Sequence, residues 1–152
     1  MLTPLNLNQV CRHVYEILLP VAQAKQIDLR WNIDDLHPIT LISDATKLTQ
    51  IITNLINNAI KFTSVGEVSI SFAVQNTNIV LQVSDTGIGI PKEQCNLIFE
   101  RFYQVQSHSK AAQRGTGLGL SISQSFAQML GGHIRVESKE GSGSVFYFTF
   151  PY

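Results

Sequence analysis

The stretch Asn54-Leu55-Ile56-Asn57-Asn58-Ala59-Ile60-Lys61-Phe62 is the clearest helical segment of the chain. Its aliphatic residues continue a stripe that begins at Leu48 and predicts a helix ending near Phe62. Ser43 or Asp44 is suited to cap the start of that helix, because both side chains accept hydrogen bonds from free backbone amides. The helix therefore has a well-defined beginning and a buried face.

Three polar residues recur on this helix at spacings of four and three residues, Asn54, Asn58 and Lys61, and so share one face. Amides on a helix otherwise rich in Leu and Ile cost free energy if they are buried without partners, which points to a metal ion or a phosphate. An amide oxygen is a hard ligand of the kind that Mg²⁺ accepts, so Asn58 is the candidate metal ligand. Exposed or capping amides would need no ligand, and this alternative stays open for the motif taken alone.

Outward from this helix, the hydrophobic pattern predicts strands in pairs. Alternating residues predict two hairpins, one joined around Gln75–Asn78 and one around Gly141 and Gly143. Ile27–Ile33 and Ile39–Ile42 are β-rich runs separated by a turn, and they predict an earlier pair of strands.

Further helices are predicted on both sides of the central one. Spacings of three and four residues predict a helix over Leu7–Ala24, with an end or a kink expected at Pro20. A short helix is expected from Pro91 through Phe99, and a longer one from about Thr116 to Leu130. Paired strands with single helices predict one α/β domain over residues 1–152, a two-layer sandwich with a mixed β-sheet covered on one face by about three helices.

The composition limits the class of function. The 152 residues carry 11 basic and 11 acidic side chains, so the overall charge favours neither nucleic acid nor an anionic membrane as a partner. No apolar run approaches the roughly 20 residues that span a bilayer, and the start lacks a signal-peptide pattern. The two cysteines, Cys11 and Cys95, are too few for a disulfide framework.

Two glycine-containing segments suggest a ligand. Asp85-Thr86-Gly87-Ile88-Gly89-Ile90 follows a strand, where a carboxylate can accept the exocyclic amine of adenine while glycines let the backbone approach the ring. The segment Arg114–Leu120 contains three glycines and leads into a predicted helix. The first backbone amides of that helix would face an anion. Its spacing excludes a Walker loop and a Rossmann unit. The polar residues before it, rich in Ser, Lys and Arg, suggest a nucleotide lid.

Taken together, four ordered motifs resemble those of sensor histidine kinases. Asn54–Phe62, Asp85–Gly89, Phe99–Phe102 and Gly115–Leu120 match the N box, first glycine box, F box and second glycine box of that family. The similarity extends over about residues 44–150. It implies the Bergerat ATP-binding fold, shared with gyrase-like and chaperone-like ATPases, with a flexible ATP lid at about residues 100–116.

The resemblance also implies roles for individual residues. Asp85 would hold the adenine amine, Asn58 the Mg²⁺ ion, and Lys61 and Asn54 the phosphates. Arg101, Lys110 or Arg114 would approach the γ-phosphate, and Asn54, Lys61, Arg101 and Arg114 are the expected catalytic residues. The implied ATP-binding set is Asn54, Asn58, Lys61, Phe62, Asp85, Gly87, Gly89, Ile90, Phe102, Gly115, Thr116, Gly117, Leu118, Gly119 and Leu120.

The chain departs from the family pattern in two places. Arg114 stands where the second glycine box often begins with another glycine. None of His13, His37, His108 and His133 is followed by Glu or Asp, as the family's phosphoacceptor histidine is, so the acceptor is expected outside this chain. The resemblance implies a histidine-bearing dimerisation domain and a response-regulator receiver domain as partners, a cytoplasmic location without direct membrane contact, no nucleic-acid partner, and a monomeric fragment.

Two other functions stay open at this point. In the related ATPases a Glu one turn before the Mg²⁺-ligating Asn activates water, and here that position is Asn54, which cannot act as a base and so favours transfer over hydrolysis. The second alternative is an interaction module that binds nucleotide without transferring phosphate.

Overall fold

The structure is a computed structural model that describes residues 1–104 and 118–152. Its main sheet has five strands in the order β2-β4-β5-β7-β6, in which β2 runs parallel to β4 and the other neighbours are antiparallel. The strands are β2 (Asp28–Trp31), β4 (Glu67–Gln75), β5 (Asn78–Asp85), β6 (His133–Lys139) and β7 (Gly143–Pro151). Both predicted hairpins, β4–β5 and β6–β7, are confirmed.

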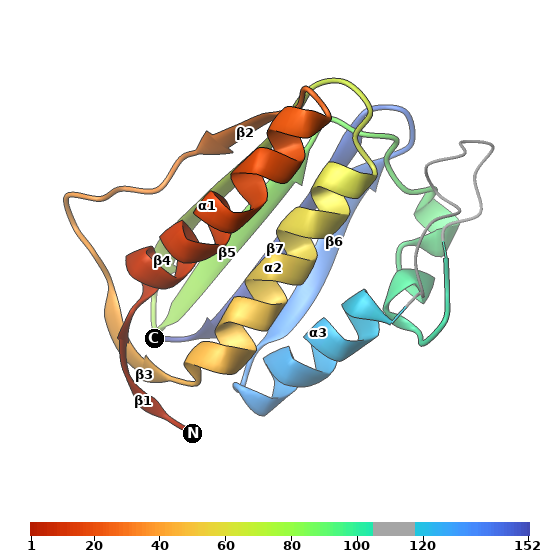
Figure 1. Cartoon of the computed structure of the whole chain (residues 1–152). Helices are drawn as coiled ribbons and strands as arrows, with labels where there is room; N and C mark the ends of the chain where they lie inside the picture. Colours follow the sequence, from red (N-terminus) through yellow and green to blue (C-terminus); the bar gives the residue numbers. More distant parts are fainter. Residues whose placement is uncertain (105–117) are drawn as a thin grey trace.

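Three helices lie side by side over one face of this sheet: α1 (Leu7–Ala24), α2 (Ala45–Lys61) and α3 (Gly119–Met129) (Figure 1). The central helix, α2, begins where the sequence predicts, since the Asp44 side chain accepts a hydrogen bond of 3.1 Å from the backbone N–H of Lys47. Its buried stripe, Leu48, Ile51, Ile52, Leu55, Ile56, Ala59 and Ile60, packs onto the sheet. Each fully buried Leu or Ile contributes about 1.5–3 kcal/mol. The predicted two-layer α/β sandwich is therefore confirmed.

The predicted early pair of strands is wrong. The strand β2 pairs with β4 in the main sheet, whereas β3 (Thr40–Ser43) pairs antiparallel with β1 (Thr3–Asn6), a strand that the sequence analysis did not predict. Each of the three strands has only four residues. Such short runs carry too little pattern to specify their partners, which are chosen by packing.

The first helix has the predicted bounds, Leu7–Ala24, and does not end at Pro20. Pro20 and Glu16 are both exposed, so water can solvate the Glu16 carbonyl that Pro20 leaves without a partner. The predicted helix from Pro91 through Phe99 is wrong: two 3-10 turns, η1 (Lys92–Gln94) and η2 (Leu97–Phe99), occupy this stretch. A segment this short is marginal as an α-helix, and 3-10 turns are common connectors.

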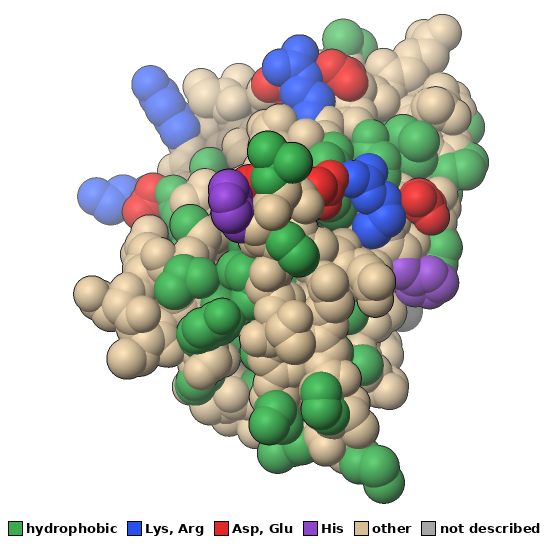
Figure 2. Space-filling model, turned by 90° about the vertical axis from the view of Figure 1, so that its left-hand side faces the viewer, with side chains coloured by type: hydrophobic (Ala, Val, Ile, Leu, Met, Phe, Trp, Pro, Cys, Tyr) green, Lys and Arg blue, Asp and Glu red, His purple; other side chains and the backbone are tan. Residues whose placement is uncertain are grey.

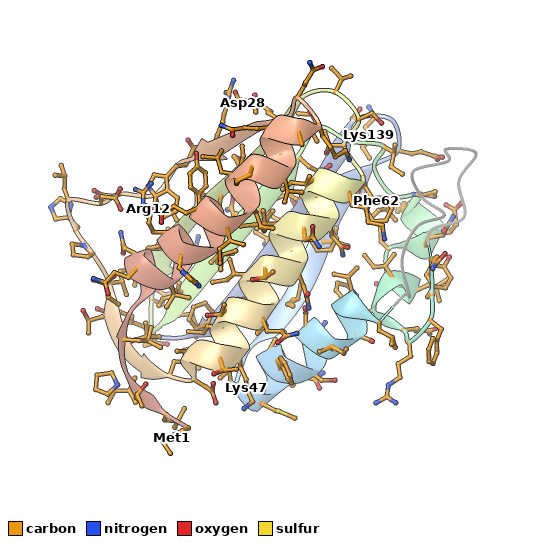
Figure 3. All side chains as sticks on the ribbon, viewed as in Figure 1. Met1, Arg12, Asp28, Lys47, Phe62 and Lys139 are labelled. Atoms are coloured by element: carbon orange, nitrogen blue, oxygen red, sulfur yellow. The ribbon has the colours of Figure 1, made fainter. Side chains whose placement is uncertain are left out.

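Charged and polar side chains cover much of the side that carries α1 and the connection from β2 to β3. Hydrophobic side chains on this side are interspersed with polar atoms (Figure 2). Within residues 1–104 and 118–152, the structure contains no helix of the length and apolarity needed to cross a membrane. At the opposite side, Phe62 projects from the end of α2 toward the segment that contains η1 and η2 (Figure 3). Phe62 lines a cavity at this side of the molecule.

Candidate functional site

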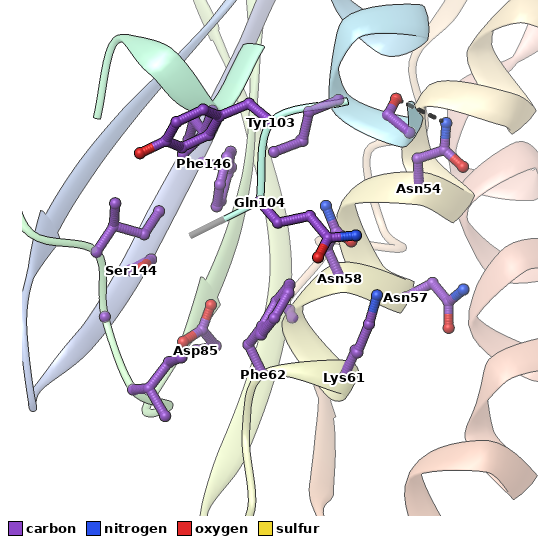
Figure 4. Close-up of a pocket in the computed structure, with 17 residues that line it drawn as sticks. Asn54, Asn57, Asn58, Lys61, Phe62, Asp85, Tyr103, Gln104, Ser144 and Phe146 are labelled. Atoms are coloured by element: carbon purple, nitrogen blue, oxygen red, sulfur yellow. Dashed lines mark hydrogen bonds between the residues drawn. The ribbon is translucent and has the colours of Figure 1, made fainter. Parts of the chain in front are cut away.

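A cavity of about 350 Å³ lies where four distant segments of the chain meet (Figure 4). These segments are the second half of α2, the loop after β5, residues 98–104, and the first turn of α3, with β7 closing one side. The lining residues are Asn54, Asn57, Asn58, Ala59, Lys61, Phe62, Asp85, Ile88, Gly89, Ile90, Ile98, Tyr103, Gln104, Gly119, Leu120, Ser144 and Phe146.

Asp85 ends β5 and carries a carboxylate that is largely removed from water. Its side chain accepts a 2.9 Å hydrogen bond from the backbone N–H of Gly87, and only 8% of the residue is exposed. Burial raises the pKa of this carboxyl group to about 6, because the charged form loses hydration, although the backbone N–H groups of Gly87 and Ser144 partly oppose the shift. The result is a desolvated hydrogen-bond acceptor facing a cavity, suited to a ligand N–H.

The glycines after Asp85 allow close backbone packing. A Cβ on Gly87 would lie 2.2 Å from the carbonyl oxygen of Phe62, and a Cβ on Gly89, where φ is +68°, would lie 2.1 Å from the carbonyl oxygen of Lys139. Two backbone hydrogen bonds also hold Ile88. Its N–H donates to the carbonyl of Phe62, and its carbonyl accepts from the N–H of Gly141. Gly89 lines the cavity, but Gly87 does not, so Gly87 acts through packing against the end of α2.

The face of α2 that the sequence predicts as polar does line the cavity. Asn58 and Lys61 are half-buried, and Figure 4 shows their side chains near that of Gln104, with Phe62 between Lys61 and Asp85. The Lys61 ammonium nitrogen lies 5.2 Å from the centre of the Phe62 ring. Amide and ammonium groups at one end and a carboxylate at the other suit a ligand with an N–H-bearing ring and an anionic tail.

A divalent cation at this site would take few ligands from the protein. Among the described residues, no three His, Cys, Asp or Glu side chains are grouped so that they could hold a metal. The Asn58 oxygen is a suitable hard ligand, and Mg²⁺ usually retains several waters and shares phosphate oxygens. The side chains therefore fit an ion that enters together with a phosphate ligand.

Asn54 contacts α3 in addition to lining the cavity. Its amide nitrogen donates to the Gly119 carbonyl at 3.3 Å (Figure 4) and to the Ser123 hydroxyl at 2.9 Å. Both amide hydrogens are thus used within the protein. In this arrangement Asn54 has no amide hydrogen left to donate to a ligand.

The first turn of α3 faces the cavity with backbone N–H groups that have no acceptor within the helix itself. Leu118 occupies the N-cap position and its apolar side chain makes no capping hydrogen bond. Gly119 and Leu120 line the cavity, so the positive end of the helix dipole faces it. This end of the cavity favours an anion.

Several predicted residues do not line the cavity. Gly87 and Leu118 are not among its lining residues, and Arg101 and Phe102 are exposed, with 72% of Phe102 accessible to solvent. Lys110, Arg114, Gly115, Thr116 and Gly117, and most of the predicted lid, lie outside the described residues.

Sequence reasoning missed other lining residues, which are Asn57, Ala59, Ile88, Ile98, Tyr103, Gln104, Ser144 and Phe146. Ser144 could have been found from strand register, since it pairs with Asp85 across β5 and β7. Tyr103 is held by a 2.8 Å hydrogen bond from its hydroxyl to Gln94, a contact between loops that no local pattern reveals.

The comparisons with known proteins agree with this geometry. Residues 43–152 match the family described as "Histidine kinase-, DNA gyrase B-, and HSP90-like ATPase". The chain belongs to this family. The family resemblance predicted from the four motifs is confirmed, and membership supports nucleotide binding at the cavity.

Curated relatives with high similarity are sensor kinases. The chain is 41% identical over 135 residues to the aerobic respiration control sensor protein ArcB of Escherichia coli (strain K12), a match that covers 86% of this chain and 17% of ArcB. It is 36% identical over 143 residues to the sensor histidine kinase RcsC of Salmonella typhimurium (strain LT2), covering 94% of this chain and 15% of RcsC. The chain therefore spans about one-sixth of the length of these relatives.

Solved structures support the same fold. Full-length ShkA in complex with AMPPNP superposes with a TM-score of 0.86 at 32% identity, covering 99% of this chain and 31% of that one. The nucleotide-free catalytic domain of the histidine kinase ThkA gives a TM-score of 0.85 at 32% identity, covering 99% and 97% of the two chains. The whole of this chain thus corresponds to a histidine-kinase catalytic domain in fold.

Proposed function

We propose that this chain binds Mg-ATP and serves as the catalytic domain of a sensor histidine kinase, supplying the γ-phosphoryl group to a histidine on another domain. The observation that carries the proposal is the polarity of the cavity. A buried carboxylate, Asp85, stands at one end, and the amide and ammonium groups of Asn58 and Lys61 stand at the other, beside the start of α3.

The base of ATP fits the Asp85 end. The carboxylate would accept the exocyclic amine of adenine, while Phe62, Ile90 and Phe146 supply apolar contacts to the ring. Guanine carries a carbonyl at the position of that amine. Its oxygen and the Asp85 carboxylate are both hydrogen-bond acceptors, and they would face each other without water between them. The desolvated Asp85 therefore favours adenine.

The phosphates fit the opposite end. Lys61 and the backbone N–H groups at the start of α3 would hold the phosphate oxygens, and Asn58 would ligate the Mg²⁺ ion, which neutralises phosphate charge when bound. Arg101 and Arg114, and the glycines Gly115 and Gly117, are proposed to complete this end when the lid is closed. Phe102, which is exposed in this structure, is also proposed to contact the bound nucleotide.

In the proposed transfer, a bond forms between the γ-phosphorus and a ring nitrogen of the acceptor histidine as the bond to the β–γ bridging oxygen breaks and ADP leaves. Positioning and charge neutralisation supply most of the rate enhancement in such reactions. Asn54 is an amide and cannot remove a proton from water, which favours transfer over hydrolysis. The acceptor domain and a response-regulator receiver domain are the proposed partners, and the proposed setting is the cytoplasm.

The test is a titration of Mg-ATP into the wild-type chain and into Asp85→Asn by calorimetry, with circular dichroism to establish that both are folded. We expect binding by the wild type and little or none by the variant. Adding a separately expressed histidine-bearing domain should then give an acid-labile, base-stable phosphoprotein.

Other outcomes would replace the proposal. A folded wild type that does not bind Mg-ATP would indicate an interaction module without nucleotide chemistry. Rapid ATP hydrolysis without any partner would instead indicate an ATPase of the gyrase or chaperone kind.

A further inference from the structure

We propose that Asn54 and Ser123 form a latch that positions the first turn of α3 against the metal-binding face of α2, and that Asn54 does not itself hold phosphate. The term latch denotes here the hydrogen bonds from the Asn54 amide to Ser123 and Gly119. The inference rests on the proposed function, because it concerns how the phosphate end of the same cavity is assembled.

The chemistry of the partners determines how the Asn54 amide is turned. A backbone carbonyl only accepts hydrogen bonds, so the group that faces the Gly119 oxygen must be the amide NH₂. The second hydrogen of the same NH₂ reaches the Ser123 hydroxyl at 2.9 Å. The Asn54 carbonyl oxygen is then the only polar atom of this side chain that remains for the cavity, and an oxygen acceptor repels a phosphate oxygen.

The Ser123 hydroxyl is buried, and its loss would leave the Asn54 amide without one of its hydrogen-bond partners. Ser123 has no exposed surface, and it lies one turn after Gly119 on the side of α3 that faces α2. A buried hydroxyl stabilises an interface only when it is paired, and removing one partner leaves the other without a hydrogen bond. The pair therefore selects one relative position of the two helices.

This position sets the geometry of the phosphate end. Asn58 lies one turn after Asn54 on the same face of α2, and Gly119 and Leu120 line the cavity from α3. A shift of α3 along α2 would move its first backbone amides away from Asn58 and Lys61. The Asp85 end shares no residue with the latch, so it should be unaffected by such a shift.

The test compares Asn54→Ala, Ser123→Ala and the double variant, with Ser125→Ala as a matched control. Ser125 is an exposed serine on α3 and contributes nothing to the latch. Affinity for AMPPNP with Mg²⁺ is measured by calorimetry, and affinity for adenosine by NMR titration. We expect each single variant to lose about tenfold in AMPPNP affinity, to change less than twofold for adenosine, and to lose no more when combined.

Two results would overturn the latch. If Ser123→Ala keeps wild-type AMPPNP affinity while Asn54→Ala loses it, Asn54 contacts the phosphates directly. If both variants weaken adenosine and AMPPNP equally, the pair only stabilises the fold. Failure of the wild type to bind either ligand would instead overturn the proposed function, and the latch with it.

A second variant keeps the test decisive if Ser123→Ala does not fold. Ser123→Cys keeps a side chain of the same shape, slightly larger at the sulfur, and offers a weaker acceptor. It should give a smaller loss of AMPPNP affinity in the same direction, with adenosine binding unchanged. Equal loss for both ligands, or no loss for either, would count against the latch.

Discussion

The two ends of the cavity are built in different ways. At the Asp85 end, the backbones of β5, β7 and the last turn of α2 lie in direct contact, and glycines are required for that contact. At the phosphate end, α2 and α3 meet through side chains, chiefly Asn54 and Ser123. The base-binding end is therefore part of the folded core, whereas the phosphate end depends on how two helices are positioned.

This difference predicts opposite effects of Asp85 on binding and on stability, and the binding effect is the largest that we expect. Asp85→Asn should weaken Mg-ATP binding about 100-fold, because an amide NH₂ would face the exocyclic amine of adenine. The same change should raise the free energy of unfolding of the ligand-free protein at pH 7, by about 1 kcal/mol, because it removes a desolvated charge.

The sign follows from the pKa of the Asp85 carboxyl. In the folded protein this pKa is raised from 3.8 to about 6, so the folded state holds the proton more tightly than the unfolded chain. The contribution of Asp85 to stability therefore increases as pH falls from about 6 toward 4, and at pH 7 the charged group is unfavourable. Thermal unfolding without nucleotide measures this, and an Asp85→Asn protein less stable than wild type at pH 7 would contradict it.

Glycine substitutions should separate residues needed for the fold from residues needed for the ligand. Gly143 has a φ of +118°, and a Cβ there would lie 2.1 Å from the backbone oxygen of Asp85, whereas a Cβ on Gly119 meets no atom of the described residues within 4 Å. Gly143→Ala should cost about 2–3 kcal/mol of stability. Gly119→Ala should leave stability unchanged or raise it by up to about 1 kcal/mol.

The glycine at α3 should matter instead for AMPPNP. Gly119 lines the cavity, so an added methyl group would enter the space that the phosphates need. Denaturant unfolding and calorimetry on the two variants measure both effects. If Gly119→Ala destabilised the protein more than Gly143→Ala, the contrast between the two ends would be wrong.

The sequence predicted the residues of short motifs better than the residues that only tertiary packing brings to the cavity. Asp85, Gly89 and Phe62 at the base-binding end and Asn58 at the phosphate end belong to motifs in which a few neighbouring residues determine the local structure, and all four line the cavity. Tyr103 and Phe146 line it as well, but only tertiary packing brings them there. The latch was not predicted either, because Ser123 and Asn54 are 69 residues apart.

The same limit explains the strands. The long strands β4, β5 and β7 alternate over eight or nine residues, and their pairing was predicted correctly where a tight turn joins neighbours. The four-residue strands β2 and β3 were assigned to each other because they are adjacent in sequence. Their true partners, β4 for β2 and β1 for β3, come from other parts of the chain.

The pH dependence of binding should distinguish the two ends directly. Adenosine carries no phosphate that titrates near pH 6, so its binding reports on Asp85 alone. Because the ligand requires the carboxylate, affinity should be constant above about pH 7 and fall about tenfold between pH 7 and pH 5, as protonation competes with binding. NMR titrations across this range measure the effect, with circular dichroism to establish that the fold persists. Adenosine binding that is independent of pH would place the base away from Asp85.

The smallest effect that we expect concerns Lys25, which stabilises the end of α2 from outside the cavity. Its ammonium group donates to the carbonyl of Ile60 at 2.6 Å and to that of Lys61 at 3.3 Å. A cation at the C-terminal end of a helix satisfies free carbonyls and interacts favourably with the helix dipole, by about 0.3–1 kcal/mol. Lys25→Met keeps the apolar stem and should lower stability by that amount, whereas Lys25→Arg should restore it.

Because the base-binding end is held by backbone contacts as well, neither variant should change Mg-ATP affinity more than twofold. A larger loss of affinity in Lys25→Met with unchanged stability would mean that the last turn of α2 moves with this lysine, and that the base-binding end is as adjustable as the phosphate end.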